Sequence, residues 1–194
     1  MEKNIIIYTF IYFIHLTSFC QKIDYNNFNN KLMNNAMLIE FNNFRKKNNL
    51  DTLIYSEELF NNVSKPNCLE VSDSSIKSNF DVFYHPDLNK KANNLNIKNR
   101  LILDHNNNFN KKINNKIKYS VYENAFKTNI NKNTYQEMAK YAIFLWSKSE
   151  SHSKTQNLNF NYLKMLGIFS CHSVYTSKKV LYIYINFAKI DNVN

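Results

Sequence analysis

The stretch that decides the fold runs from 122 to 152. It holds Tyr122-Glu123-Asn124-Ala125, then Thr134-Tyr135-Gln136-Glu137, and finally Trp146-Ser147-Lys148-Ser149-Glu150-Ser151-His152. The segment 134–137 has the form of a capping box, in which the Thr hydroxyl and the Glu carboxylate satisfy the first free amides of a helix. Apolar residues then recur at three- and four-residue intervals as far as Trp146, which predicts an amphipathic helix. A carboxylate, Glu123, and an imidazole, His152, thus flank this helix, and we expect a short loop to return the imidazole toward the sheet that follows.

The last fifth of the chain is typical of a β-hairpin. Segments 166–175 and 180–188 are rich in β-branched and aromatic residues, and 176–179 supplies the turn. The second segment is apolar on both faces, which indicates a sheet that is covered on both sides. With helices before and between the strands, the pattern predicts an α/β fold, a three-layer α-β-α sandwich with a C-terminal β-hairpin.

Two further helices are predicted nearer the N-terminus. The first covers 31–47, where apolar residues fall near helical spacing and a basic Arg-Lys-Lys run suits the C-terminal end. The second begins after Ser56, a suitable N-cap, and is expected to kink or end at Pro66. Residues 119–122 are a candidate short strand that leads to Glu123.

The composition favours a folded domain over a disordered chain. The protein has 194 residues, a net charge of +10 and 44% hydrophobic residues, and roughly one residue in five is Asn. Disordered segments lack that apolar content. The basic residues are scattered and no nucleic-acid-binding signature is present, so no nucleic-acid partner is expected. Because Gly167 is the single glycine, turns elsewhere are expected to use Asn, which tolerates positive φ better than other residues.

The N-terminus has the pattern of a secretory signal over 1–20. Lys3 is followed by an apolar run and by Ser18-Phe19-Cys20 as a cleavage site. The alternatives are a membrane anchor, for which the apolar run is short, and a lipoprotein signal at Cys20, for which Phe19 is a poor fit. We therefore expect a secreted, periplasmic or extracellular protein with no transmembrane span after cleavage. A polar lead over 21–30 would precede one domain over 31–190, with an Asn/Lys-rich excursion at about 86–118.

Cleavage of the signal would leave two cysteines, Cys68 and Cys171. An even number of cysteines in an oxidising compartment suggests a disulfide between them. Two separate buried thiols are the alternative, because the sequence gives no distance between the two side chains.

Taken together, the motifs resemble the CAP superfamily of cysteine-rich secretory, antigen 5 and pathogenesis-related proteins, in particular its bacterial secreted branch. The resemblance runs from about 36 to 188. Its motifs are Asn42-Asn43-Phe44-Arg45, Leu50 to Tyr55, Tyr84-His85, Tyr122-Glu123-Asn124-Ala125, Trp146 to His152, Leu166-Gly167-Ile168-Phe169 and the closing strand 182–188. The chain departs from the family pattern at Tyr122 and Ser151, which stand where the family has Gly. It departs again at Ser149, which stands where eukaryotic members have a second acid.

The resemblance implies a cleft in which His85, Glu123 and His152 converge. Such a set suits Zn²⁺ or another divalent cation, with His85 and His152 as ligands. Each residue also has an ordinary structural alternative. His85 would be a plain loop residue, Glu123 would cap a loop or pair with a Lys, and His152 would be a helix C-terminal His that the helix dipole favours.

The function that the resemblance implies is that of a secreted CAP-like domain, a non-enzymatic binding or interaction protein. Its cleft would take an extracellular lipid, a peptide or a divalent metal, or would contact a surface component. One alternative is a metal-dependent hydrolase with Glu123 as its general base. The other is a structural cell-surface protein with a vestigial cleft. No activated serine or cysteine nucleophile motif is present, which disfavours serine or cysteine proteolysis.

Overall fold

The computed structural model describes residues 21–24, 26–79, 83–86, 118–129, 134–158, 165–175 and 178–192. The predicted signal segment 1–20 lies outside the described residues. The same holds for 87–117, which make up nearly all of the predicted excursion.

The centre of the fold is a mixed four-stranded sheet with the order β1-β3-β4-β2. Its strands are β1 (Ile54–Tyr55), β2 (Lys118–Asn129), β3 (Met165–Tyr175) and β4 (Lys178–Asn192). β3 and β4 form the predicted antiparallel hairpin, β2 pairs antiparallel with β4, and β1 pairs parallel with β3. The hairpin prediction is confirmed. The predicted short strand at 119–122 is in fact part of a twelve-residue strand that carries Glu123 in its interior.

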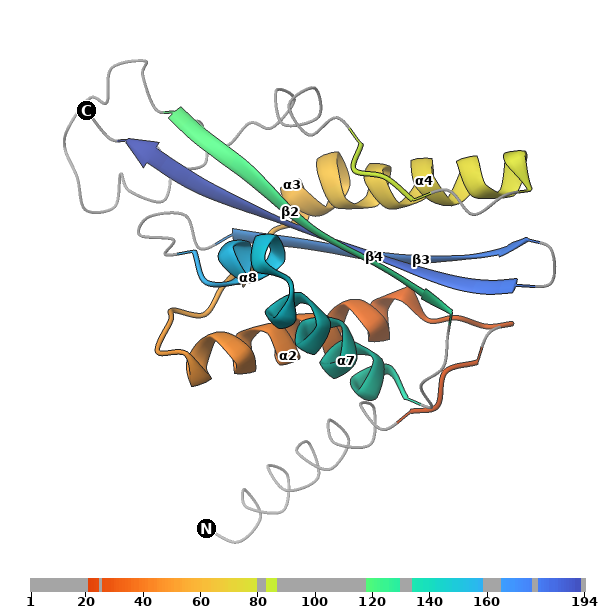
Figure 1. Ribbon diagram of the computed structural model, residues 1–194, viewed down its shortest axis with the longest axis horizontal. Coiled ribbons are helices and arrows are strands. Elements are labelled where there is room, and N and C mark those ends of the chain that lie inside the picture. Colours follow the sequence, from red (N-terminus) through yellow and green to blue (C-terminus); the bar gives the residue numbers. More distant parts are fainter. Residues whose placement is uncertain are drawn as a thin grey trace, which may run out of the picture.

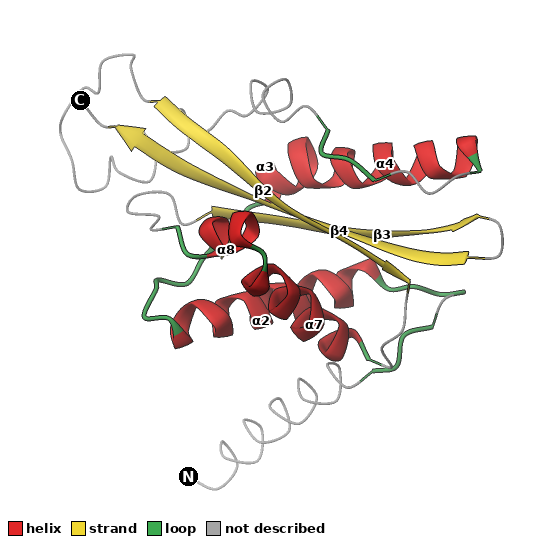
Figure 2. Ribbon diagram, viewed as in Figure 1, coloured by secondary structure: helices red, strands yellow, loops and turns green. Residues whose placement is uncertain are grey.

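Helices cover both faces of this sheet, so the predicted three-layer arrangement is confirmed. In Figures 1 and 2, α2 (Asn30–Lys47) and α7 (Tyr135–Lys148) lie on one face, and α3 (Glu57–Leu59) and α4 (Lys65–Ser78) lie on the other. The core is divided accordingly. On the α2/α7 face, the buried strand residues are Phe126, Leu166, Ile168, Leu181, Ile183, Ile185 and Phe187; on the α4 face, they are Ala125, Phe169, Cys171, Val180, Tyr182 and Tyr184.

Asn residues cap helix α2 at both ends, Asn29 at the N-terminal end and Asn48 at the C-terminal end. The Asn29 side chain accepts a hydrogen bond from the Leu32 amide at the N-cap. Beyond the C-terminal end, Asn49 has a φ of 56°, and Asn79, which follows α4, has a φ of 51°. Both positions would usually favour Gly. The expectation that Asn takes over this role is therefore met at these two helix ends.

Arg45, in the last turn of α2, is fully buried and ties distant segments together. Its Nε donates to Asp51 O at 2.6 Å, and its Nη1 donates to Gln156 O at 2.8 Å and to Leu158 O at 3.1 Å. Burial lowers the pKa of Arg45, and the charge of Asp51 opposes this shift. The carbonyls solvate the buried guanidinium in place of water. Arg45 thereby fixes residues 156–158 against the end of α2.

The helical segment after Ser56 is longer than the sequence predicted. Ser56 caps α3 through the Leu59 amide, as expected. A π-helical turn, η1 (Phe60–Ser64), then leads into α4, which runs on to Ser78. Pro66 was expected to kink or end the helix; the helical segment does not end there but continues to Ser78. Pro66 lies in the first turn of α4, directly after the π-helical turn, in which the backbone hydrogen bonds span five residues.

Gly167 explains how closely this helical segment approaches the sheet. A Cβ atom built on Gly167 would lie 2.6 Å from Leu59 Cβ, 2.7 Å from Leu59 C and 2.8 Å from Phe60 N. Only a residue without a side chain leaves room for the backbone of α3 and η1 at this point. The single glycine of the chain is therefore required by packing of the helix on β3.

The capping-box helix forms as predicted, but its continuation differs. Thr134 and Glu137 make the reciprocal capping hydrogen bonds, and α7 continues to Lys148. A second helix, α8 (Glu150–Gln156), follows at once with Ser149 between the two. The expected loop at His152 was wrong. Because Ser149 has extended backbone angles, the chain bends there and then resumes a helical path.

Candidate functional site

The candidate site is built around the carboxylate of Glu123, in the middle of β2. Its side chain is only 1% exposed. Oε1 contacts His85 Nδ1 at 2.7 Å, and Oε2 accepts hydrogen bonds from Asn67 Nδ2 and from Asn186 Nδ2, the latter at 2.9 Å. Three elements thus converge on one carboxylate: α4 supplies Asn67, β4 supplies Asn186, and the segment 83–86 supplies His85. These donors replace the water that an exposed carboxylate would bind.

The segment that carries His85 is held by tyrosines. The Tyr184 hydroxyl donates to Tyr84 O at 2.8 Å, and the Tyr84 hydroxyl donates to Glu70 on α4 at 2.9 Å. Burial and the charge of Glu123 raise the pKa of Tyr184, so it stays a phenol and a donor. Phe83 packs against Tyr184, with a ring-centroid separation of 6.4 Å. His85 is thereby fixed although its side chain is 52% exposed.

His152 lies in the first turn of α8 and not at a helix C-terminus. Its Nδ1 is 2.9 Å from the hydroxyl of Ser149, the residue that precedes the helix. Its carbonyl accepts from Asn124 Nδ2 on β2 at 3.2 Å, and its ring lies 6.4 Å from the buried ring of Trp146. The predicted stabilisation by a helix C-terminal dipole is therefore wrong, because the N-terminal turn disfavours a positive charge.

The pKa values of the two imidazoles are shifted in opposite directions. The hydrogen bond to Glu123 raises the pKa of His85, helped by the Glu123 charge and opposed by burial. Burial lowers the pKa of His152, and the charge of His85 lowers it further. His85 and His152 are thus near enough to influence each other electrostatically. The lowered pKa favours the uncharged imidazole of His152, which is the form that binds a cation.

The arrangement also fixes which ring nitrogens face outward. A carboxylate only accepts hydrogen bonds, so His85 Nδ1 carries the proton toward Glu123 and Nε2 is its second nitrogen. Nδ1 of His152 is also engaged, by the Ser149 hydroxyl, which can either donate or accept this hydrogen bond. In a metal-binding histidine, one ring nitrogen binds the metal and the other usually donates its hydrogen to a protein group. Glu123 thus stands as the partner that orients His85.

The structure therefore brings Glu123 and His85 into direct contact, with His152 beside them. Within the described part of the chain, no group of three His, Cys, Asp or Glu side chains is arranged to hold a metal ion. Glu150 is exposed and pairs with Lys154 at 2.7 Å. His172 lies in β3, and His105 falls outside the described residues.

Sequence reasoning missed Asn67 and Asn186, the two amides that hold Glu123. Asn186 had a usable signal, because it is a polar residue inside the apolar run of 180–188 and is fully buried. Asn67 had none, since it is one more Asn in a chain that is rich in Asn. Its role depends on the continuation of α4, which the sequence did not predict.

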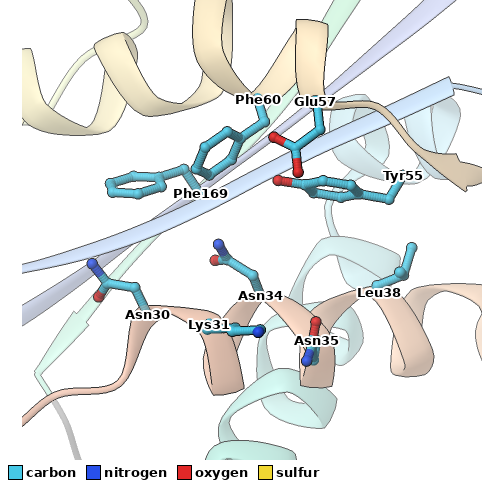
Figure 3. Close-up of a pocket in the computed structure, with 9 residues that line it drawn as sticks. All are labelled: Asn30, Lys31, Asn34, Asn35, Leu38, Tyr55, Glu57, Phe60 and Phe169. Atoms are coloured by element: carbon cyan, nitrogen blue, oxygen red, sulfur yellow. The ribbon is translucent and has the colours of Figure 1, made fainter.

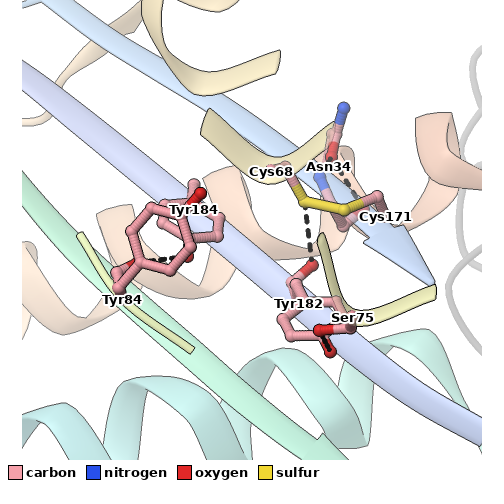
Figure 4. The surroundings of a disulfide bond; sticks show 8 residues. Asn34, Cys68, Ser75, Tyr84, Cys171, Tyr182 and Tyr184 are labelled. Atoms are coloured by element: carbon pink, nitrogen blue, oxygen red, sulfur yellow. Dashed lines mark hydrogen bonds between the residues drawn. A yellow bond between two sulfur atoms is a disulfide. The ribbon is translucent and has the colours of Figure 1, made fainter. Parts of the chain in front are cut away.

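Cys68 on α4 and Cys171 on β3 form a disulfide, with a Cα–Cα distance of 6.1 Å. Figure 4 shows the bond between the helix and the sheet, with Tyr182 beside it. It lies on the same face of the sheet as Glu123 and ties down the helix that carries Asn67. Within the residues that the structure describes, no helix combines the length and hydrophobicity that crossing a membrane would require.

The sequence matches no family model and no curated protein. Two solved structures resemble this chain at 16% identity and a TM-score of 0.47 each. One is an outer surface protein from Borrelia burgdorferi, for which the match covers 87% of this chain and 98% of that one. The other is a cysteine-rich secretory protein from Staphylococcus aureus; the match covers 82% of this chain but only 39% of that longer protein.

Proposed function

We propose that this protein is an exported binding domain without catalytic activity, which holds a divalent cation at His85 and His152 and, through it, an extracellular ligand. The observation that carries the proposal is the hydrogen bonding of Glu123. One of its oxygens orients His85 and the other accepts from Asn67 and Asn186. His85 is thereby positioned as a ligand, with a fixed ring orientation.

The same hydrogen bonds favour binding over hydrolysis. A general base has to reach a water molecule and take its proton. Both oxygens of Glu123 already have partners, and its side chain is 1% exposed. The hydrolase alternative therefore lacks an available base at this position. The binding alternative needs only a buried carboxylate that orients His85, and Glu123 has this arrangement.

The donor set fits a borderline cation such as Zn²⁺. Imidazole nitrogens suit Zn²⁺, and two protein ligands leave positions open for the donor atoms of a bound molecule. A peptide carboxylate or a polar group on a surface component would be a suitable donor.

The proposal of export rests on the predicted signal segment 1–20. It is supported by the disulfide between Cys68 and Cys171, since such bonds persist in oxidising compartments. Mass spectrometry of protein recovered from the medium or the periplasm would test it. We expect a mature N-terminus near Gln21, and a retained segment 1–20 would contradict export by cleavage.

Zinc titration by calorimetry tests the site itself. We expect micromolar binding by the wild type and a loss of at least about tenfold in affinity in the His85→Ala and His152→Ala proteins. His105→Ala, a histidine outside the motifs, should bind like the wild type. Equal affinities in all four proteins, or no uptake, would leave the structural cell-surface alternative. A zinc-dependent hydrolysis that is lost in Glu123→Gln while zinc still binds would favour the hydrolase.

A further inference from the structure

A cavity lies at the opposite edge of the sheet from Glu123. It has a volume of about 490 Å³ and lies between α2 on one side and Tyr55, Glu57 and Phe60 on the other, with Phe169 of β3 behind them. Figure 3 shows these side chains as two facing walls. Cavities of this size hold small molecules. Because β3 and β2 are on opposite sides of β4, this cavity is separate from the histidine site.

One wall of the cavity is aromatic. The rings of Tyr55 and Phe60 have centroids 5.9 Å apart, and those of Phe60 and Phe169 are 5.4 Å apart and meet edge to face. Phe169 is buried, while Tyr55 and Phe60 are partly exposed. Gly167 allows η1 to press on β3, and this close approach places Phe60 on Phe169. The wall is thus fixed by the packing of the fold.

The facing wall is made of side-chain amides from successive turns of α2. Asn34 Oδ1 accepts from both the backbone N and the Oγ of Ser170, at 3.1 and 3.0 Å. This fixes the amide plane and leaves Nδ2 as a donor without a partner among the described residues. Asn30 Oδ1 is a buried acceptor that likewise has no partner within the described part of the chain. Asn35, which follows Asn34 in the chain, is exposed at the rim of the cavity.

Further polar groups join the aromatic wall. The Tyr55 hydroxyl makes no hydrogen bond to another described residue, and Glu57 places its carboxylate beside it (Figure 3). Burial, together with the charge of Glu57, raises the pKa of Tyr55 to about 12, so the hydroxyl remains a donor. Lys31 on the opposite wall offsets the charge of Glu57. The cavity therefore offers both hydrogen-bond donors and acceptors beside the aromatic wall, and its one Lys and one Glu balance in charge.

We infer that this cavity binds one unit of a neutral saccharide. A sugar ring has a C–H face that packs on aromatic rings and a rim of hydroxyls that both donate and accept, and the two walls supply the matching groups. An alkyl chain would leave the Asn30, Asn34 and Tyr55 groups buried without partners, which is costly. A charged ligand would leave either Lys31 or Glu57 unfavourably placed.

The test is a titration of isotope-labelled, full-length protein followed by NMR, with two probes, N,N′-diacetylchitobiose and cellobiose. We expect millimolar binding of at least one probe, with shifts confined to residues around the cavity. Tyr55→Phe removes a hydroxyl, and Glu57→Gln replaces a charged acceptor by a weaker, neutral one; each should weaken binding about five- to tenfold. Asn35→Ala tests the rim, and Asn43→Ala, the same change at an exposed position on α2 away from the cavity, should bind like the wild type.

The outcomes separate the two sites. Shifts around Phe60 and Phe169 that the His85→Ala protein also shows would support a saccharide site independent of the histidine site. The inference is overturned if neither sugar shifts these signals, or if Tyr55→Phe and Glu57→Gln bind as tightly as the wild type. It is also overturned if an alkyl maltoside and a sugar-free alkyl detergent shift the signals equally while the free sugars do not.

Discussion

Asn186 and Glu123 face each other directly in the sheet, and Asn186 Nδ2 donates to Glu123 Oε2 at 2.9 Å. The pair is set by the register of β2 against β4. A slip of one residue would turn Asn186 toward α7 and leave Glu123 without this donor. The long ladder between the two strands therefore does more than hold the sheet together, because it aligns the carboxylate that orients His85.

Replacing Asn186 by Ala should destabilise the protein and weaken the site together. The change leaves a buried carboxylate with one donor fewer, which typically costs about 1–3 kcal/mol. We expect the free energy of unfolding, measured by urea denaturation, to fall by about this amount. The affinity for zinc should fall as well. Asn43→Ala, which removes an exposed amide from α2, is the matched control. Unchanged unfolding in Asn186→Ala would show that the hydrogen bond contributes nothing.

The two histidines should titrate on opposite sides of 6.5, the usual pKa of His. NMR of the ring protons should give a pKa above this value for His85 and below it for His152. In Glu123→Gln the main cause of the shift is lost and burial remains, so the pKa of His85 should fall. A pKa of His85 that is the same in both proteins would refute the contact with Glu123.

The raised pKa of His85 also predicts how stability depends on pH. Protonated His85 stabilises the folded state, and this contribution is fully present below pH 6.5 and is lost as the pH rises through the folded pKa. The free energy of unfolding should be compared between His152→Gln and the double variant with His85→Gln, so that His152 does not titrate. The difference should shrink as the pH rises, and a difference that grows would contradict the assigned sign.

Loss of the disulfide should destabilise the protein strongly. Cys68 and Cys171 are 103 residues apart in sequence, and in the chain-entropy model a bridge over about 100 residues is worth about 4–5 kcal/mol. The double variant Cys68→Ala, Cys171→Ala should unfold at clearly lower urea concentration. The wild type in reductant should behave similarly. Equal free-thiol counts in wild type before and after reduction would disprove the bridge.

Gly167→Ala should destabilise the protein although the added group is small. Its Cβ would meet the backbone of Leu59 and Phe60 at under 3 Å, and backbone cannot rotate away. Overpacking of this kind costs about 1–3 kcal/mol. The thermal unfolding midpoint should fall, and the NMR signals of Phe60 should shift. A variant as stable as the wild type would mean that α3 and η1 move away freely.

The parts of the fold that the sequence predicted are those with local physical causes. The Thr134–Glu137 capping box, the Ser56 N-cap and the apolar hairpin strands each depend on neighbouring residues, and each is present. Pro66 misled because proline both ends helices and begins them, and the residues before it form a π-helical turn. The choice between these roles depended on packing against β3, which no local pattern encodes.

The candidate site was predicted only in part, for a similar reason. His85, Glu123 and His152 occupy motif positions, and the structure places the first two in contact. Asn67 and Asn186 come from elements far from Glu123 in sequence, so no spacing could have revealed that both oxygens are engaged. Likewise, the contact between the Ser149 hydroxyl and Nδ1 of His152 was not predicted from the sequence.

Arg45 has a consequence for how the protein is made. Two of its carbonyl acceptors belong to Gln156 and Leu158, more than a hundred residues downstream. Helix α2 therefore leaves the ribosome with a cation two of whose acceptors have not yet been synthesised. Until that segment emerges, the guanidinium has to stay partly hydrated, so α2 completes its packing only after residue 158 has been synthesised.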